Sequence, residues 1–438
     1  MDRVPISEVG VHAGEQITVA GFCQTIRNQG SITFIMLRDV SGVIQVVVVG
    51  KENPSVLEAA AGLSLESVIA VSGLAKAEKQ APGGIEVAAE KIEVLSLASP
   101  ELPIPVLEKG EENEAEIDKR LDWRWIDLRK PEKTLIFRVA TTFEHAFREY
   151  WTTNRYIEIH SPKLMSSPSE SGAELFRVQY FEREAFLAQS PQFYKQMAMA
   201  AGFERVFEVG PVFRAEHSFT SRHATEFTGF DAEISYIDSY RDVTRELAKT
   251  IQYALGRVEA RHRQEIFEMY GRKVIIPDVP FPHLTMAEAK AALREMGAAS
   301  SEADLTPEEE RRISEYVKEK KGHEFVFVTG YPVSVRPFYH MRKEDEPGTT
   351  GSFDLLWNGL EMATGAQREH RYDVLVSQAK EKGVGLDSIR FYLNFFKYGC
   401  PPHGGFGMGP TRMLMKLLDI PNIREATYLY RGVKRLEP

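Results

Sequence analysis

The chain has 438 residues and a formal net charge of −9, with 43% hydrophobic and 27% charged residues. This length and balance fit a globular protein of two or three domains, and no apolar run approaches the length that spans a membrane. The acidic total argues against a general DNA- or RNA-binding protein, although a local basic patch can bind nucleic acid within an acidic whole.

Two further features narrow the class of protein. The N-terminal residues MDRVPISEVGVHAGEQ lack the charged and then apolar pattern of a signal peptide. Cys23 and Cys400 are the only cysteines and lie far apart in the sequence, which argues against a disulfide framework and a cysteine metal site. We therefore expect a cytoplasmic protein.

Residues 1–98 have the pattern of a compact β domain. Five strand-like runs are separated mostly by glycine-containing turns, and the helix-like NPSVLEAAAGL falls between the third and fourth runs. This order is the signature of an OB-fold, a small barrel that often binds single-stranded nucleic acid. Phe34 is then either a stacking platform for an unpaired base or a core residue, and Gln45 is placed to hydrogen-bond a base edge.

Residues 99–133 predict a linker, because SPELPIP is proline-rich and KGEENEAEIDKR is charged, so that neither part should pack as a core element. From 134 to 438, helix and strand patterns alternate without a regular βαβ period. This favours an α+β domain, with a mainly antiparallel sheet flanked by helices, over a Rossmann fold.

Two helices stand out in this second part by an apolar residue at every fourth position. The apolar face of the later helix, around 243–255, is interpreted as part of the hydrophobic core. The earlier helix, 135–153, carries a stripe that fits either core or a subunit interface. Its members are Leu135, Val139, Phe143, Phe147 and Trp151.

Residues 275–325 carry one clear signal, a Thr–Pro start with an acidic first turn in DLTPEEERRISEYVKEKKG, which predicts a helix N-terminus. We find no chemistry-bearing pattern there. We therefore expect a surface insertion at about 270–330.

Residues 213–235 predict a strand, an exposed loop and a strand. Arg214 and Arg222 at the mouth of such a hairpin can hold phosphate oxygens, and Glu216 can accept a hydrogen bond from an exocyclic amine. A nucleoside triphosphate needs both kinds of partner. The alternative is a solvated, charged hairpin tip.

Residues 403–415, HGGFGMGPTRMLM, predict a glycine-rich turn that leads into an apolar helix. Glycines let the backbone approach a ligand closely, and Arg412 supplies a fixed positive charge. The spacing matches neither a P-loop nor a dinucleotide fingerprint.

Together, the hairpin and the glycine-rich turn resemble motifs 2 and 3 of class II aminoacyl-tRNA synthetases. The helix 135–153 followed by YIEIHSPKLM, with Pro162, resembles motif 1. The resemblance extends over essentially the whole chain and is nearest to aspartyl-tRNA synthetases of archaeal type. It implies an anticodon-binding OB-fold, a homodimer formed through motif 1, and ATP-dependent formation of an aminoacyl-adenylate followed by transfer to tRNA.

The resemblance also implies a role for each residue of the nucleotide site. Arg214 is expected to contact the α-phosphate and Glu216 the adenine amino group. The remaining ATP-binding residues are Arg222 and His223 beside the β- and γ-phosphates, Phe227 stacked on adenine, Arg412 closing the other face, and Glu361. Arg214 and Arg412 are the predicted catalytic residues.

Asp354 and Glu361, in SFDLLWNGLEMATG, are predicted to hold Mg²⁺ from two neighbouring strand positions, because this cation prefers carboxylate and phosphate oxygens. The alternative for each acid alone is a solvated carboxylate. Motif 3 usually has an acidic residue before its arginine, and Thr411 stands there in this chain.

The amino-acid pocket is predicted from three segments. Glu170 is a candidate partner for the α-ammonium group, Gln192 and Lys195 lie in AQSPQFYKQ, and Arg368 lies in GAQREHR. A desolvated carboxylate without a cationic partner is costly. Lys195 and Arg368 therefore favour L-aspartate over asparagine.

The choice of tRNA is indicated by two positions in the OB-fold. In the family that the chain resembles, enzymes strict for tRNA-Asp tend to carry Trp in the first-strand region and Lys before the last strand. Gln24 and Pro82 stand there in this chain, which favours a relaxed enzyme that also aspartylates tRNA-Asn. The alternatives are an asparaginyl-tRNA synthetase, a tRNA-independent adenylate-forming paralogue that makes asparagine, and a catalytically inactive RNA-binding protein.

Overall fold

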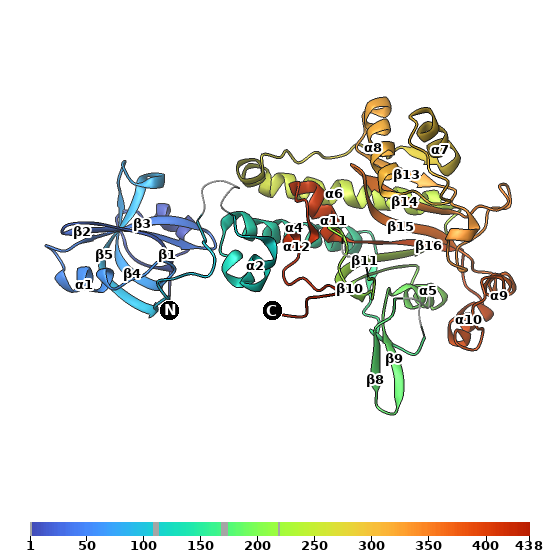
Figure 1. The fold of residues 1–438 in the computed structure, drawn as a ribbon, viewed down its shortest axis with the longest axis horizontal. Coiled ribbons are helices and arrows are strands. Elements are labelled where there is room, and N and C mark those ends of the chain that lie inside the picture. Colours follow the sequence, from blue (N-terminus) through green and yellow to red (C-terminus); the bar gives the residue numbers. More distant parts are fainter. Residues whose placement is uncertain (1, 108–113, 168–173, 218–219) are drawn as a thin grey trace. The chain divides into compact units, whose positions relative to one another are not determined.

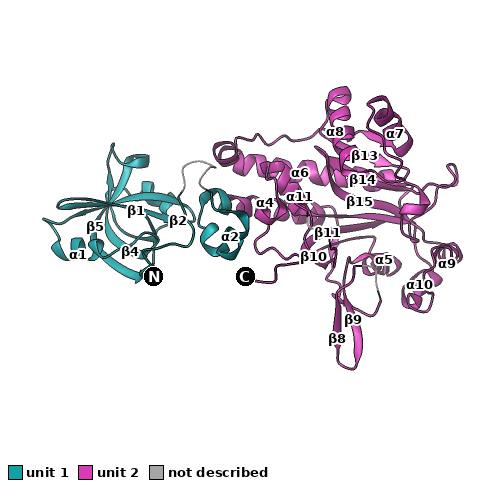
Figure 2. Cartoon of the chain, viewed as in Figure 1, with its two compact units in different colours: residues 1–134 teal, residues 135–438 magenta. Residues whose placement is uncertain are grey.

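The computed structural model describes residues 2–107, 114–167, 174–217 and 220–438. Its contacts divide the chain into two compact units, Met1–Thr134 and Leu135–Pro438, which Figure 2 colours separately. Among the described residues, none of the helices combines the length and the apolarity that crossing a membrane requires.

The first unit contains a closed five-stranded barrel, in the strand order β1-β2-β3-β5-β4 (Figure 1). The strands are β1 (Gln16–Gln29), β2 (Ile32–Asp39), β3 (Gly42–Val49), β4 (Val68–Ala77) and β5 (Ile85–Ser96). Helix α1 (Pro54–Ala61) follows β3, and the Asn53 side chain caps it by accepting from the Val56 amide. Five strands with a helix after the third confirm the predicted OB-fold.

The barrel is filled by alternate strand residues, as period-2 strands require. Ile35, Ile44 and Val46 are buried in its core. Phe34 and Gln45 alternate with these residues and are only half-buried, so they lie on the outer face of the sheet. The core interpretation of Phe34 is therefore excluded.

The segment that joins the barrel to the second unit is partly packed. Ile104 and Val106 are buried in a small cluster with Ile126, which lies on the short helix α3 (Arg124–Asp127) after α2 (Ile117–Asp122). The prediction that no part of this linker packs as a core element was therefore wrong. The prolines of SPELPIP did not prevent burial because the two aliphatic side chains lie beside a helix that offers an apolar surface.

The second unit is built on an eight-stranded sheet in the order β12-β13-β14-β15-β16-β11-β10-β6. The strand pairs are antiparallel except for β12 with β13 and β6 with β10. The strands are β6 (Ile157–Glu158), β10 (Arg205–Phe213), β11 (Glu226–Ser235), β12 (His283–Thr285), β13 (Phe325–Thr329), β14 (Ser352–Trp357), β15 (Leu360–Arg368) and β16 (His403–Met408). This agrees with the mainly antiparallel sheet that the sequence predicted.

Helices flank the sheet, and a separate three-stranded sheet projects beside it (Figure 1). The helices are α4 (Pro131–Thr153), α5 (Gln192–Ala200), α6 (Tyr240–Tyr270), α7 (Met286–Glu295), α8 (Pro307–Lys321), α9 (Tyr372–Glu381), α10 (Arg390–Lys397), α11 (Pro410–Leu418) and α12 (Ile423–Ala426). The small sheet comprises β7 (Leu164–Met165), β8 (Arg177–Tyr180) and β9 (Arg183–Leu187).

The apolar stripe on α4 forms core inside the chain. Its five members are each at most 1% exposed, and Phe143 and Phe147 pack against Phe230 of β11. The stripe is covered by the face of the chain's own sheet, because that face needs an apolar partner as much as the helix does. The interpretation of this stripe as a subunit interface, which the resemblance to motif 1 favoured, was therefore wrong.

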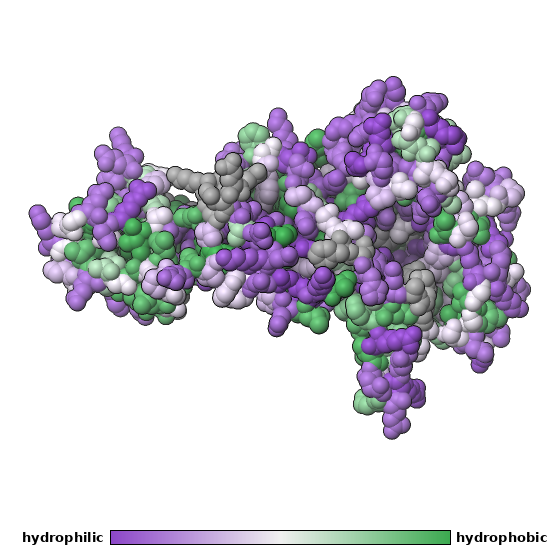
Figure 3. Space-filling model, in the orientation of Figure 1, coloured by the Kyte–Doolittle hydropathy of each residue, from purple (hydrophilic) through white to green (hydrophobic). Residues whose placement is uncertain are grey.

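Residues 283–329 contribute to the central sheet. Strand β13 is buried along its length and pairs with β14, and β12 pairs with β13. The predicted helix start at Thr306 is present: Thr306 and Glu309 form a capping box at the beginning of α8. The surface over α7 and α8 is mostly hydrophilic on the face drawn in Figure 3.

Candidate active site

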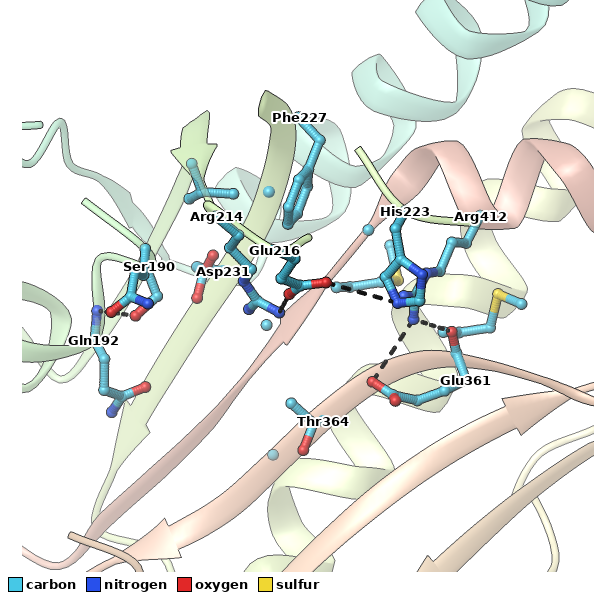
Figure 4. A pocket seen from close by; sticks show the side chains of 18 of the residues that line it. Ser190, Gln192, Arg214, Glu216, His223, Phe227, Asp231, Glu361, Thr364 and Arg412 are labelled. Carbon is cyan, nitrogen blue, oxygen red and sulfur yellow. Dashed lines mark hydrogen bonds and ion pairs between the residues drawn. The ribbon is translucent and has the colours of Figure 1, made fainter. Parts of the chain in front are cut away.

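The second unit contains a cavity of about 330 Å³ above the β10–β11 hairpin, β15 and the end of β16 (Figure 4). Most of the residues predicted for catalysis and substrate binding line it. These are Gln192, Lys195, Arg214, Glu216, Arg222, His223, Phe227, Glu361, Arg368 and Arg412. Glu170 lies outside the described residues, and Asp354 is not among the lining residues.

The loop of the β10–β11 hairpin is fixed by the C-terminal segment. The Thr225 amide donates to the Arg431 carbonyl at 3.0 Å and the Ile423 amide to the Ser221 carbonyl at 2.8 Å. The Tyr430 hydroxyl donates to the His223 carbonyl at 3.2 Å. The loop is thus braced against the pocket, and the interpretation as a freely solvated tip is excluded for residues 221–225.

At one end of the cavity, Glu216 lies between Arg214 and His223. Its carboxylate is 3.8 Å from Arg214 and 3.8 Å from His223 Nε2. The Arg214 guanidinium lies 5.6 Å from the centre of the Phe227 ring. Burial, followed by the charge of Arg412, lowers the pKa of His223, so this histidine is a neutral hydrogen-bonding group at neutral pH.

Arg412 enters from the first turns of α11 and is held by β15. Its Nη1 donates to the Glu361 carbonyl oxygen at 3.0 Å and is 3.9 Å from a Glu361 carboxylate oxygen. Arg214 and Arg412, which are distant in sequence, therefore reach one cavity from two elements. Thr411 also lines this cavity.

Asp354 and Glu361 lie on the adjacent strands β14 and β15. Arg336 donates to one Asp354 oxygen at 2.6 Å, while the other oxygen is buried without a hydrogen-bond partner. Burial, followed by the charge of Asp354, raises the pKa of Glu361. Within the described ranges no three His, Cys, Asp or Glu side chains form a group that could hold a metal ion alone.

Glu310 of α8 also reaches this end of the site, although no sequence pattern indicated it. Its carboxylate lies 3.4 Å from Arg222 Nη1. Burial, with the charge of Glu361 second, raises the pKa of Glu310 to about 7. Residues 283–329 thus contribute a carboxylate beside the pocket as well as two strands of the sheet.

The opposite end of the cavity contains a buried set of opposite charges. Lys195 Nζ donates to Asp231 Oδ1 at 2.8 Å and lies 3.4 Å from Glu233 Oε2. Arg368 Nε donates to Glu233 Oε1 at 3.0 Å, and Arg368 Nη1 contacts His340 Nε2 at 2.9 Å. Lys195, Glu233 and Arg368 are each at most 3% exposed.

The charges in this set fix one another's protonation states. Burial by itself raises the pKa of Glu233, but Arg368 and then Lys195 overcome that effect and hold it below its usual value. Burial, followed by the charge of Arg368, holds the pKa of His340 well below the usual value. His340 is therefore neutral and accepts the Arg368 N–H at Nε2.

The glycines of HGGFGMG make room for this charge set. A Cβ at Gly405 would lie 2.1 Å from the Glu233 carboxylate, and one at Gly407 would lie 3.2 Å from Asp231. The Lys195 ammonium also donates to the Phe406 carbonyl at 3.0 Å, and Arg368 Nη2 to the Gly405 carbonyl at 3.1 Å. The sequence attributed these glycines to ligand approach, and two of them also admit buried carboxylates.

Sequence reasoning missed Asp231, Glu233, His340 and Arg336 at this site. The first two could have been found, because TGFDAEIS places two acids in an otherwise apolar strand, and a buried acid requires a cationic partner. Gln192, which is predicted to bind aspartate, lines the cavity, and its amide donates to Gln196 at 2.9 Å.

In the barrel, the four predicted anticodon residues lie on or beside its outer surface. Phe34 pairs with Val47 across β2 and β3, and Gln45 donates to Glu86 at 2.9 Å. Gln24 stands at the irregularity between Cys23 and Thr25 of β1, and its side chain accepts from Arg38 at 3.4 Å. Pro82 is exposed at the start of η2 (Pro82–Gly84).

Comparison with known families gives two matches along the chain. Residues 116–431 match the class II tRNA synthetases (D, K and N), and residues 17–95 match the OB-fold nucleic acid binding domain. The chain belongs to the class II aminoacyl-tRNA synthetases. As a member it is a ligase whose substrates are ATP, an amino acid and tRNA.

Relatives of known name cover nearly the whole chain. The chain is 45% identical to an aspartate–tRNA(Asp/Asn) ligase of Aeropyrum pernix, over 97% of this chain and 96% of that protein. It is 41% identical to an aspartate–tRNA(Asp) ligase of Pyrococcus abyssi, over 97% of each.

Solved structures share the fold of the full chain. The asparaginyl-tRNA synthetase of Pyrococcus horikoshii with asparaginyl-adenylate has a TM-score of 0.92 at 32% identity, covering 100% of both chains. The aspartyl-tRNA synthetase of Entamoeba histolytica has a TM-score of 0.90 at 31% identity, covering 100% of this chain and 93% of that one.

Proposed function

We propose that this synthetase is an aspartate–tRNA ligase that charges tRNA-Asn as well as tRNA-Asp. The observation that carries the amino-acid assignment is the convergence of Lys195 and Arg368 on Glu233 at one end of the cavity. The names of the relatives support the same assignment.

Hydrogen-bond chemistry favours aspartate over asparagine at this end of the pocket. Lysine and arginine only donate hydrogen bonds, and a carboxylate accepts on both oxygens. A side-chain amide offers these two donors only one accepting oxygen, and its NH₂ group would have to turn towards Asp231 or Glu233, which already accept from Lys195 and Arg368. Asparagine would therefore lose a charge-assisted hydrogen bond, a cost of about 1–3 kcal/mol.

The asparaginyl alternative has one observation in its favour, the fold shared with the Pyrococcus horikoshii asparaginyl-tRNA synthetase. A shared fold does not select the side chain, because the two kinds of enzyme differ in the pocket and not in the framework. The tRNA-independent alternative is disfavoured by the intact barrel, which a catalyst without an anticodon to read would not need.

The reaction proceeds by positioning and charge neutralisation. The aspartate α-carboxylate attacks the α-phosphorus of ATP and pyrophosphate leaves, while Arg214 and Arg412 stabilise the negative charge on the phosphate oxygens. Glu216 accepts the adenine amino group and Phe227 stacks on the ring. The 3′-terminal ribose hydroxyl of tRNA then attacks the carbonyl carbon of the adenylate and AMP leaves, so that no covalent enzyme intermediate is required.

The residues present fit a bound Mg²⁺. Asp354 offers a buried oxygen without a hydrogen-bond partner, and burial, followed by the charge of Asp354, raises the pKa of Glu361 on the adjacent strand. Because no third His, Cys, Asp or Glu joins these two acids among the described residues, phosphate oxygens and water would complete the shell, which is the usual arrangement for this cation. When bound, Mg²⁺ would neutralise charge on the triphosphate.

The tRNA assignment rests on Gln24 and Pro82, which stand where strict enzymes tend to carry Trp and Lys. The relatives at 45% and 44% identity are named as aspartate–tRNA(Asp/Asn) ligases. We also propose a cytoplasmic homodimer, as in the family. Its interface must lie on a surface other than the buried α4 stripe. Light scattering coupled to size-exclusion chromatography measures the molar mass and so tests whether the chain is a dimer.

The test is aminoacylation of purified tRNA-Asp and tRNA-Asn transcripts with labelled aspartate and, in parallel, with labelled asparagine. Both transcripts are expected to be charged. Charging of tRNA-Asp alone would refute the relaxed tRNA choice, and charging of tRNA-Asn by asparagine but not aspartate would refute the amino-acid assignment.

A further inference from the structure

Helix α8 is docked so that its first turn has a fixed position beside the nucleotide end of the pocket. The buried Glu309 accepts from Lys290 at 2.7 Å, from the Ser300 amide at 2.8 Å and from the Thr306 amide at 2.8 Å. These contacts fasten the beginning of α8 to α7 and to the loop between the two helices.

A second contact fastens the same turn to the sheet. A Cβ at Gly359, in the turn between β14 and β15, would lie 2.7 Å from Arg311 Cγ and 3.0 Å from Arg311 Cα. Only a glycine lets this turn approach α8 so closely. Figure 1 shows α8 alongside β14 and β15. Glu310, between Glu309 and Arg311, is thus held from both sides.

Glu310 pairs with Arg222 of the β10–β11 loop. The two side chains are 13% and 24% exposed, and the carboxylate oxygen lies 3.4 Å from Nη1. The pair joins a helix of the segment 283–329 to an arginine that lines the pocket. Arg222 is a long side chain on a loop, and without a partner it would sample many rotamers.

We propose that Glu310 is a positioning residue for ATP binding, which holds the Arg222 guanidinium at the triphosphate end of the pocket before the nucleotide arrives. The proposal rests on the proposed function of Arg222 as a β- and γ-phosphate ligand. Glu310 itself does not touch the substrate. It reduces the ordering that Arg222 must undergo on binding, which is the general way in which preorganisation improves affinity.

The test compares Glu310→Gln with the matched control Glu315→Gln, which changes an exposed glutamate of the same helix that pairs with Arg312. Aspartate-dependent ATP–pyrophosphate exchange gives KM and kcat, and calorimetric titration with ATP gives Kd without turnover. Glu310→Gln is expected to raise KM and Kd for ATP about fivefold, as for a partly buried ion pair. The KM for aspartate, kcat and Tm should not change, and Glu315→Gln should match wild type.

A double-mutant cycle separates positioning from a direct effect of the charge. In the Arg222→Gln background, Glu310→Gln should have no further effect on ATP binding. Unchanged or tighter ATP binding in Glu310→Gln, additive effects in the cycle, or a loss of Tm with both KM values raised would each overturn the proposal. If wild type shows no aspartate-dependent exchange, the proposed function fails instead.

Discussion

The two units of the molecule use polar residues in opposite ways. In the catalytic unit, the charges that we propose select the substrate are buried and paired, with Lys195, Glu233 and Arg368 at most 3% exposed. In the barrel, the residues proposed to read the anticodon lie on the outer face above an aliphatic core. Buried charges couple strongly to one another, whereas surface groups act almost independently. Substitutions in the cavity of the catalytic unit should therefore change ATP–pyrophosphate exchange, and substitutions of these residues on the barrel surface should change only the binding of tRNA.

The largest effect is expected at Arg214. Arg214→Ala removes a donor to the reacting phosphate and should reduce kcat/KM for ATP–pyrophosphate exchange at least 10³-fold, by roughly 4 kcal/mol. Binding of tRNA, measured by filter retention, should stay within about twofold. The exposed Arg177→Ala, on β8, serves as the control. Retention of exchange activity in Arg214→Ala would show that the phosphate lies elsewhere.

The next largest effect is expected at Lys195. Lys195→Gln should raise the KM for aspartate about 10²-fold and leave the KM for ATP nearly unchanged, because a buried charge-assisted contact is lost. The variant also leaves Asp231 without its cationic partner, whereas Glu233 keeps Arg368, so Tm must be measured. Lys195→Gln with Asp231→Asn restores the charge balance and should recover Tm but not the KM. Recovery of both would assign Lys195 a purely structural role.

A smaller effect is expected at Phe34, in the other unit. Phe34→Ala should raise the KM for tRNA about tenfold, because base stacking contributes about 1–3 kcal/mol. ATP–pyrophosphate exchange should not change. Val43→Ala, at an exposed site of the same barrel, is the matched control. A change in exchange activity with no change in the KM for tRNA would contradict the assignment of tRNA binding to the barrel and of adenylate formation to the second unit.

The smallest effect is expected at His283 on β12, remote from both sites. Burial, followed by the charge of Arg241, lowers its pKa to about 4, so the unfolded chain binds a proton at a higher pH than the folded chain. Stability should therefore fall as pH decreases from about 6.5 towards 4. His283→Phe should reduce this loss by about 1 kcal/mol at pH 5, measured as a smaller fall in Tm. The exposed His160→Phe should keep the wild-type profile, and an unchanged profile in His283→Phe would contradict the assignment.

Much of the fold could be predicted from the sequence because its signals are local. Strand alternation with a helix after the third strand gave the barrel, and Thr306 with Glu309 marked the start of α8. The burial of the α4 stripe could not be predicted, because a helix pattern does not reveal whether the chain's own sheet or a second subunit covers it. Ile104 and Val106 were missed for a similar reason.

Site residues that belong to sequence motifs could be predicted, whereas site residues that only the tertiary structure brings to the cavity could not. Arg214, Phe227 and Arg412 come from motif positions, and they reach one cavity. Glu310 and His340 come from segments without a sequence signature, and only the packing of α8 and the loop before β14 brings them there. Asp231 and Glu233 are an intermediate case. The apolar pattern of their strand predicts that both acids are buried, but it does not predict which cations pair with them.

The proposed function depends most on which amino acid binds in the cavity with Lys195 and Arg368. The most direct measurement is ATP–pyrophosphate exchange by the purified wild-type enzyme, with L-aspartate and L-asparagine in parallel. The account predicts exchange with aspartate and at least 10²-fold lower kcat/KM with asparagine. Equal exchange with both amino acids, or exchange with asparagine alone, would contradict it.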